Sequence, residues 1–206
     1  MFKKYAVILA LLVIVPLTLS NVIAAGADDA RQFVDGLGKK VLDVVNASGG
    51  GKDQKQKQLE EMFVEHVDIP WMGQFVLGRA WQKAPPEQRD RYLQAYRAYL
   101  LAHYTSDFAE YTGAKYTITD IKSEEDGQFT VNMQINTSNQ SQNTLAGYRL
   151  RSNNGQLKII DIIVEGVSLI TTERAEFADI AQQKGMDGLI QSIHDKTQTE
   201  KQPTAK

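Results

Sequence analysis

Two hydrophobic periodicities divide this chain into a helix-forming part and a strand-forming part. In the first part, apolar residues such as Phe33, Leu37 and Val41 recur every three or four positions, which is the spacing of one face of an amphipathic helix. Asp68 followed by Pro70 is typical of a helix N-cap with proline in the first turn. The predicted helices cover residues 27–47, 52–67, 71–78 and about 86–111.

Beyond residue 115 the hydrophobic period falls to two, which predicts β-strands. The stretch FTVNMQINT at 129–137 alternates cleanly, so one face of its strand is expected to be covered. Four consecutive strands are predicted, near residues 116–121, 129–136, 144–151 and 157–164, before short helices at 172–183 and 186–194. This order predicts an α+β fold, in which helices precede a curved antiparallel meander sheet of about four strands that is closed by C-terminal helices.

The last predicted strand, LKIIDIIV, is apolar on both of its faces. Ile159, Ile160, Ile162, Ile163 and Val164 point to both sides of a pleated strand, so both sides are expected to be dry. One side can pack on the preceding helices. The other side needs a second cover, which is either the C-terminal helices or a bound apolar ligand.

Aromatic residues gather on one arc of the longest predicted helix. The residues of this arc are Tyr92, Tyr96, Tyr99, Leu100, His103, Tyr104 and Tyr111, with Phe108 at its edge. Such a stripe either packs the core or lines a ligand cavity, and tyrosine suits a cavity because its ring is apolar while its hydroxyl bonds water at the mouth. His103 is expected to be a core residue hydrogen-bonded to a tyrosine, and Arg91, Gln94 and Thr105 to form the solvent-exposed edge.

The N-terminus has the organisation of a secretory signal peptide. Lys3 and Lys4 precede an almost wholly apolar run from Tyr5 to Leu19, and small residues follow at Ala24 and Ala25. The alternative is a transmembrane anchor, but the run is shorter than the roughly 20 residues that span a bilayer. Residues 1–25 are therefore expected to be a cleaved signal, residues 26–195 a single domain, and residues 196–206 a disordered tail.

Charge and cysteine content narrow the functional classes. The chain holds 23 Lys and Arg against 25 Asp and Glu, a net charge of −2. Without Lys3 and Lys4 the balance is 21 − 25 = −4, which gives no electrostatic basis for holding nucleic acid. The chain has no cysteine, so disulfides and lipidation of a signal-peptide cysteine are excluded.

Motifs for catalysis, metals and cofactors are weak or incomplete. The three histidines, His66, His103 and His194, make no zinc motif, and Gly49-Gly50-Gly51-Lys52 lacks the spacing of a phosphate loop. Gly166-Val167-Ser168 lacks the second glycine of a nucleophile elbow, so a lipid hydrolase using Ser168 is a minor alternative. No catalytic residue, no metal ligand and no cofactor is predicted, and the protein is not expected to be an enzyme.

Two segments carry a family resemblance. DIIVEGVSLITTERAEF at 161–177, followed by KGMDGLIQSI at 184–193, resembles the closing signature of the MlaC family. FVLGRAW at 75–81 and PPEQRDRYLQAYRAYLLAHY at 85–104 resemble the central pattern of the same family. These are periplasmic phospholipid carriers of Gram-negative bacteria, also called toluene-tolerance auxiliary proteins. The resemblance runs from about residue 30 to 195.

The resemblance implies a monomeric periplasmic shuttle that helps to maintain outer-membrane lipid asymmetry. Such carriers pass phospholipid between an outer-membrane lipoprotein–porin complex and an inner-membrane transporter with an MCE-domain ring and an ABC ATPase. Nucleic acid is not among the implied partners. The acyl chains occupy an apolar cavity between helices and sheet. Its implied wall is Trp71, Phe75, Val76, Leu77, Tyr96, Leu100, Tyr104, Met133, Ile135, Tyr148, Leu150, Ile162, Val164, Val167 and Ile170.

The segment Glu165-Gly166-Val167-Ser168 is interpreted as a sharp turn at the end of the sheet. Gly166 permits the turn, Ser168 is expected to cap or support it, and Thr171 or Thr172 is expected to N-cap the next helix. Glu165 is expected either at the cavity mouth or paired with Arg79 or Arg174. Two alternatives to a phospholipid carrier remain: a carrier of another lipid such as a hopanoid, or a self-packed envelope interaction module without cargo.

Overall fold

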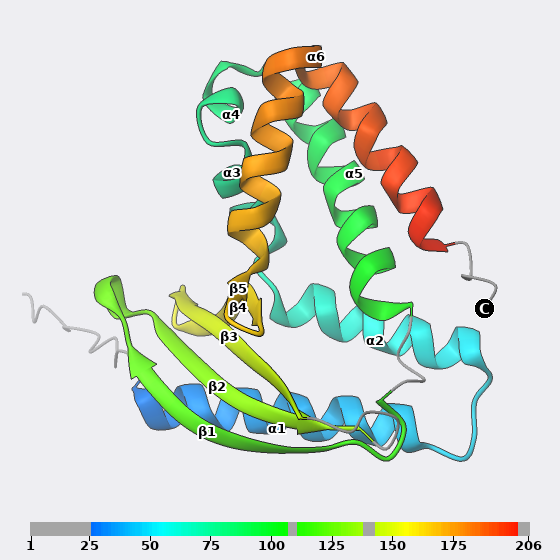
Figure 1. Cartoon of the computed structure of the whole chain (residues 1–206), viewed down its shortest axis with the longest axis vertical. Coiled ribbons are helices and arrows are strands. Elements are labelled where there is room, and N and C mark those ends of the chain that lie inside the picture. Colours follow the sequence, from blue (N-terminus) through cyan, green and yellow to red (C-terminus); the bar gives the residue numbers. More distant parts are fainter. Residues whose placement is uncertain (1–25, 107–110, 138–142, 202–206) are drawn as a thin grey trace, which may run out of the picture.

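The computed structural model describes residues 26–106, 111–137 and 143–201, and it confirms the predicted α+β class (Figure 1). The helices before the sheet are α1 (Ala27–Asn46), α2 (Lys52–His66), α3 (Ile69–Leu77), α4 (Arg79–Lys83) and α5 (Pro86–Thr105). The strands are β1 (Lys115–Ser123), β2 (Phe129–Asn136), β3 (Thr144–Asn153), β4 (Gln156–Val164) and β5 (Val167–Ser168), with the short 3₁₀ turn η2 (Glu125–Gly127) after β1. Helix α6 (Leu169–Lys201) ends the fold.

The sheet is a five-stranded antiparallel meander in the order β1-β2-β3-β4-β5. The two-residue strand β5 was not predicted. It forms because Glu165 and Gly166 have φ angles of 49° and 81°, which close a tight hairpin and turn Val167 back beside Val164. The predicted sharp turn at Gly166 is thereby confirmed.

The register aligns apolar side chains across one face of the sheet. Met133 pairs with Ala146, which pairs with Val164. One row along, Val131 pairs with Tyr148 and Tyr148 with Ile162. Because residues directly opposite each other in neighbouring strands share a face, β2, β3 and β4 present one continuous apolar surface.

Strand β4 is dry on both sides over only part of its length. The pairing with β3 passes from Asp161 to Ile159, so Ile160 is an extra residue in β4 and both Ile159 and Ile160 are buried. Toward the end of the strand the cover is lost, and Val164 is 36% exposed. The expectation of two dry faces is therefore wrong at this end, where the chain leaves the sheet through the β4–β5 hairpin.

Helix α1 covers the apolar face near β1 and β2. The Tyr116 hydroxyl donates a hydrogen bond to the Asp35 carbonyl oxygen at 2.9 Å. At Gly38 the tyrosine ring lies so close that a Cβ atom would approach it to 2.8 Å. Glycine at this position therefore lets the helix lie directly on the sheet.

Helices α3, α4, α5 and α6 stand together at the other end of the molecule (Figure 1). Tyr92, Tyr96 and Leu100 are fully buried, and Ala95 and Ala102 are buried with them. The predicted exposed edge is wrong at Thr105, which is buried and donates a hydrogen bond to the Leu101 carbonyl oxygen. The predicted aromatic arc is thus mainly packed interior.

The C-terminal end of α5 differs from the prediction in three ways. The helix ends at Thr105 rather than near Tyr111, because Thr105 and Ser106 compete for backbone hydrogen bonds and favour helix ends. Tyr111 lies in a turn and is exposed, while Phe108 falls outside the described residues. His103 is exposed rather than in the core, and its ring contacts those of Tyr99 and Tyr104.

Helix α6 bends at Gly185, where φ is 69° and ψ is 179°, at the predicted boundary between two helices. Its second half runs to Lys201, so the expected disordered tail is wrong for 196–201. Lys196 donates to Glu176 at 2.8 Å and Thr197 is buried, which ties this segment to the first half of the helix. Residues 202–206 and the predicted signal at 1–25 lie outside the described residues. Within the described ranges no helix is long and apolar enough to cross a membrane.

Candidate functional site

The structure brings thirteen of the fifteen predicted wall residues into one hydrophobic cluster that joins the helices to the sheet. Seven of them are buried: Val76, Leu77, Tyr96, Leu100, Met133, Leu150 and Ile170. Six are partly buried against the same cluster: Trp71, Phe75, Tyr104, Ile135, Tyr148 and Ile162. The spatial grouping of these residues matches the prediction, while their contact with a ligand stays a prediction.

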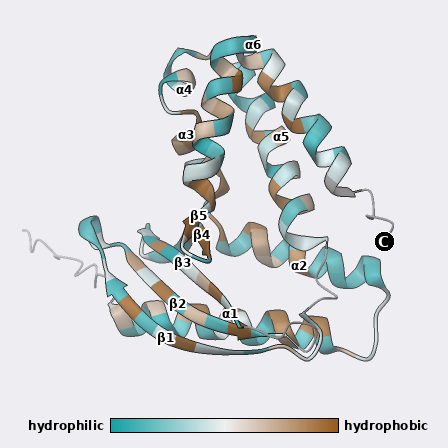
Figure 2. Ribbon diagram, viewed as in Figure 1, coloured by the Kyte–Doolittle hydropathy of each residue, from teal (hydrophilic) through white to brown (hydrophobic). Residues whose placement is uncertain are grey.

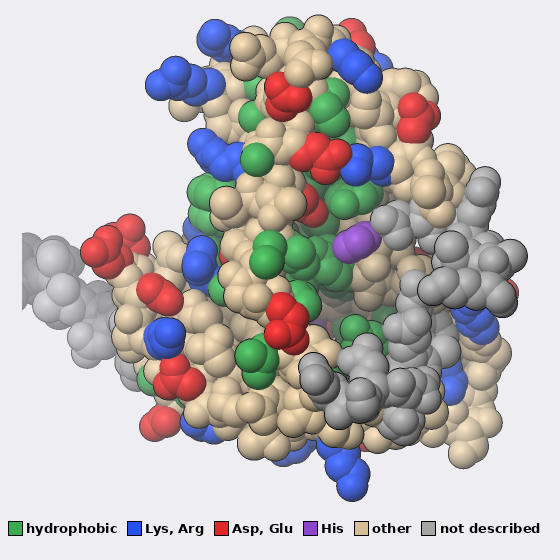
Figure 3. Space-filling model, in the orientation of Figure 1, with side chains coloured by type: hydrophobic (Ala, Val, Ile, Leu, Met, Phe, Trp, Pro, Cys, Tyr) green, Lys and Arg blue, Asp and Glu red, His purple; other side chains and the backbone are tan. Residues whose placement is uncertain are grey.

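The remaining two predicted wall residues, Val164 and Val167, lie outside this cluster. They face each other across β4 and β5 and are 36% and 54% exposed. Figure 2 shows hydrophobic positions gathered where α3 and the start of α6 meet β4 and β5. Figure 3 shows hydrophobic side chains along a hollow between α6 and the sheet. The apolar interior is thus open to solvent on this face, with the β4–β5 hairpin beside the opening.

Trp71 and Phe75 form a stacked pair whose ring centroids lie 5.3 Å apart. The Arg151 guanidinium lies 5.4 Å from the Trp71 ring centroid, and that of Arg174 lies 4.6 Å from the ring of Phe75. Arg174 also donates to the Phe75 carbonyl oxygen at the end of α3. A cation–π contact therefore covers part of each ring, and contact of Trp71 and Phe75 with a ligand stays a prediction.

Glu173 is a polar group of this region that sequence reasoning missed. It is 7% exposed, and its Oε2 accepts a hydrogen bond from the Tyr96 hydroxyl at 2.5 Å. Burial raises the pKa of Glu173 to about 7, against the lowering effect of the Tyr96 hydrogen bond. The sequence could have indicated its burial, because Glu173 lies three residues after Ile170 and four before Phe177, and residues at this spacing share one face of a helix.

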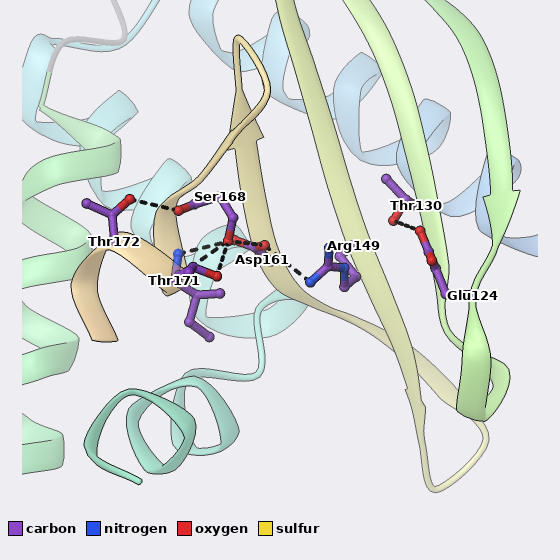
Figure 4. A network of polar contacts seen from close by, with 8 residues as sticks. Glu124, Thr130, Arg149, Asp161, Ser168, Thr171 and Thr172 are labelled. Atoms are coloured by element: carbon purple, nitrogen blue, oxygen red, sulfur yellow. Dashed lines mark hydrogen bonds and ion pairs between the residues drawn. The ribbon is translucent and has the colours of Figure 1, made fainter. Parts of the chain in front are cut away.

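Asp161 anchors the start of α6 to strand β4 (Figure 4). The buried carboxylate accepts hydrogen bonds from the Ser168 hydroxyl at 2.7 Å and from the Ile170 backbone N–H at 3.2 Å. Arg149 Nη1 lies 3.6 Å from it. Burial raises the pKa of Asp161, and these donors act in the opposite direction. The network fixes the helix at the edge of the hollow.

Two expectations about the hairpin are corrected. Ser168, rather than Thr171 or Thr172, is the N-cap of α6, because its Oγ accepts the Thr171 backbone N–H at 3.2 Å. Of the two alternatives for Glu165, the pairing with Arg79 or Arg174 is wrong, whereas a place at the cavity mouth stays a prediction. The Glu165 carboxylate accepts the Leu145 backbone N–H at 2.7 Å and so closes the end of β3 onto the hairpin.

Replacement of Ser168 by alanine is expected to lower the free energy of unfolding by about 1–2 kcal/mol. The variant loses the cap and leaves buried Asp161 without one of its donors. Urea denaturation followed by circular dichroism measures the change. Thr172→Ala is the matched control, because the Thr172 hydroxyl donates to the backbone carbonyl oxygen of Ser168 and not to Asp161. Equal losses in the two variants would contradict the anchoring role of Ser168.

A second groove, with a volume of about 410 Å³, lies between α5 and the second half of α6. It is lined by Arg91, Gln94, Ala95, Asp187, Ile190, Gln191 and His194, none of which is a predicted wall residue. Arg91 and Asp187 form an ion pair of 2.9 Å across it. Among the described residues, no group of three or more His, Cys, Asp or Glu is placed to hold a metal ion.

The fold and the open apolar interior define an α+β protein in which helices and a curved antiparallel sheet enclose a hydrophobic site. The model of the family "MlaC protein" matches residues 36–195, and the chain belongs to this family. A structure of the phospholipid-binding protein from Ralstonia solanacearum, in complex with a phospholipid, shares the fold with a TM-score of 0.74. That likeness has 23% identity and covers 84% of this chain and 99% of the other.

Two relatives extend the comparison. Toluene tolerance protein ttg2D of Pseudomonas putida is 28% identical over 106 residues, which are 52% of this chain and 49% of that protein. The intermembrane phospholipid transport system binding protein MlaC of Haemophilus influenzae is 25% identical over 129 residues, 61% of this chain and 60% of that protein. The matched stretches thus span about half to three fifths of these relatives.

Proposed function

We propose that this protein is a lipid carrier that holds the acyl chains of a phospholipid between its helices and its sheet. The observation that carries the proposal is the hydrophobic cluster of α3, α5, α6 and β2–β4, which opens to solvent beside the β4–β5 hairpin. Membership of the MlaC family and the name of the Haemophilus influenzae relative support phospholipid as the ligand. The predicted wall residues are the proposed contacts, with Val164 and Val167 at the mouth.

The energetics of an acyl chain explain why such a carrier is needed. Each methylene removed from water contributes about 0.8 kcal/mol, so a sixteen-carbon chain left in water costs on the order of 12 kcal/mol. Two chains make unassisted crossing of an aqueous gap negligibly slow. An apolar site that replaces the bilayer interior removes most of this cost, so affinity requires few contacts with the head group. Weak head-group discrimination follows from this reasoning.

The proposed place of action is the periplasm. The signal-peptide pattern of residues 1–25 supports export. Membership of the MlaC family and the name of the Haemophilus influenzae relative support a role in intermembrane phospholipid transport. In this proposal the protein exchanges lipid with an outer-membrane lipoprotein–porin complex and with an inner-membrane transporter that carries an MCE-domain ring and an ABC ATPase. It acts as a monomer and catalyses no reaction.

Purification without detergent tests the proposal. The full chain is expressed with its signal in a Gram-negative host, isolated from the periplasmic fraction, and extracted with organic solvent. Mass spectrometry of the extract is expected to find about one phospholipid per protein molecule. A protein that contains no lipid, and takes none up from phospholipid vesicles, would contradict the carrier role and favour a self-packed interaction module. Recovery of a hopanoid alone would identify a hopanoid, rather than a phospholipid, as the cargo.

A further inference from the structure

Glu173 places a carboxyl group inside the cluster that the proposed function assigns to acyl chains. It lies between Ile170 and Phe177 on the same face of α6, and both of these neighbours are buried. Its Oε2 is held by the Tyr96 hydroxyl at 2.5 Å, and the Tyr96 ring meets that of Phe177 edge-on. Glu173 is therefore part of the apolar interior rather than of the solvated surface.

No cation in the described part of the chain forms an ion pair with Glu173. Two cations of α6 are engaged elsewhere: Lys196, whose charge acts on Glu173, is paired with Glu176 at 2.8 Å, and the exposed Arg174 contacts the ring and carbonyl oxygen of Phe75. Helix α3 and strand β5 carry no ionisable residue, and Arg79 and Lys83 of α4 are exposed. The ionisable groups around Glu173 are Tyr92, Tyr96 and Tyr104 from α5, Asp161 from β4, and Glu176 and Lys196 from α6. Its surroundings thus favour the neutral acid.

Two protonation states are therefore accessible near neutral pH. Burial is the main cause that raises the pKa of Glu173 to about 7, and the nearby acids Asp161 and Glu176 act in the same direction. An acyl chain packed against this carboxyl removes the remaining water and penalises the ionised form further. Ligand and proton must then favour each other's binding, because linkage is reciprocal.

We propose, on the basis of the carrier function above, that Glu173 couples retention of the apolar ligand to a proton. The loaded protein holds Glu173 as the neutral acid, which donates or accepts hydrogen bonds without placing a charge beside hydrocarbon. Loss of this proton leaves a carboxylate among the acyl chains and loosens the ligand. A titratable side chain, that of Glu173, thus sets how firmly the lipid is held.

The same group sets the direction of a pH effect on stability. The folded-state pKa of Glu173 lies above its ordinary value of 4.5, so between these pH values the folded state binds more protons than the unfolded chain. Its contribution to the free energy of unfolding is therefore full below about pH 4.5 and is lost as the pH rises to about 7. Glu173→Gln keeps an oxygen that accepts the hydrogen bond of the Tyr96 hydroxyl. Its free energy of unfolding is not expected to show this decrease with pH.

Lipid transfer across a pH series tests the coupling. The purified protein is loaded with dioleoyl phosphatidylcholine, whose head group does not titrate between pH 5.5 and 8.5, and transfer to vesicles of the same lipid is followed. The wild-type protein is expected to retain lipid about tenfold less well at pH 8.5 than at pH 5.5, which corresponds to one pKa unit between the loaded and the empty state. Glu173→Gln is expected to retain lipid equally at both pH values.

Asp179→Asn is the matched control, since it removes an exposed carboxyl of the same helix that accepts a hydrogen bond from Gln183. It is expected to keep the wild-type pH dependence. A pH-independent wild-type protein that still binds lipid, or a Glu173→Gln variant with the wild-type slope, overturns the coupling and leaves the carrier function standing. A wild-type protein that binds no lipid at any pH overturns the carrier function itself.

A measurement on the wild-type protein alone covers the case in which Glu173→Gln does not fold. The heat of lipid binding is measured by calorimetry at pH 7.5 in buffers of different ionisation enthalpy. The difference between buffers gives the number of protons that the protein takes up with each lipid. Uptake of a fraction of one proton per lipid is expected, whereas no uptake overturns the coupling.

Discussion

Val164→Asp is expected to leave the protein folded while it loses at least nine tenths of its bound phospholipid. Val164 is 36% exposed, so its substitution costs less than about 1 kcal/mol of stability. In the proposed site, however, the new carboxylate meets acyl chains at the mouth of the hollow. Placing an ionised group against hydrocarbon costs several kcal/mol, which corresponds to more than tenfold in affinity. Lipid extracted per mole of purified protein gives the direct measurement.

Leu145→Asp is the matched control for this substitution. Leu145 is also exposed and lies in β3 beside the same hairpin, but its neighbour Ala146 is the residue that pairs with Val164. Successive side chains of a strand point to opposite faces, so Leu145 projects away from the apolar face. The control is expected to retain its lipid. Equal retention by both variants would place the ligand away from the hairpin.

Phe177→Ala is expected to have the largest effect on stability, a loss of about 3–5 kcal/mol in the free energy of unfolding. The Phe177 side chain is fully buried, and its ring makes edge contacts with Tyr96 and Tyr99 at centroid distances of 6.2 Å and 5.8 Å. Removal of the ring leaves a void where α5 and α6 meet. Urea denaturation of lipid-free protein provides the value, because bound ligand would add its own stabilisation.

Phe177→Leu separates packing from a general loss of structure. Leucine fills part of the same space, so a cost clearly below that of alanine is expected. A loss below about 1 kcal/mol for the alanine variant would mean that the region around Phe177 is not tightly packed. In that case the hollow would extend to this point between the two helices.

Much of the fold follows from local sequence signals. The alternation of β2 and the turn residues between strands predict the meander, and Asp68 caps α3 through the Trp71 backbone N–H at 3.2 Å as expected. Strand β5 is too short to show a period, and its existence depends on the conformation of Glu165 and Gly166. The helical period also cannot locate the end of α5, because competition at Thr105 is a local effect of hydroxyl side chains.

The candidate site is predictable as a group of residues but not in its polar detail. The apolar periods and the family resemblance select side chains that the fold then brings into one cluster. They do not reveal which rings are covered by arginines, as those of Trp71 and Phe75 are. Nor do they place Glu173 against Tyr96, since the two residues are 77 positions apart and meet only when α5 packs on α6.

Photocrosslinking with a phospholipid that carries a photoreactive group at the end of one acyl chain tests the proposed site most directly. The protein is loaded with this lipid, irradiated and digested, and the labelled peptides are identified by mass spectrometry. Labels are expected on the inward faces of α5 and α6 and on the apolar face of β2–β4. Labels confined to the outer face of the sheet, or to the exposed groove between α5 and the second half of α6, would contradict an acyl-chain site inside the molecule.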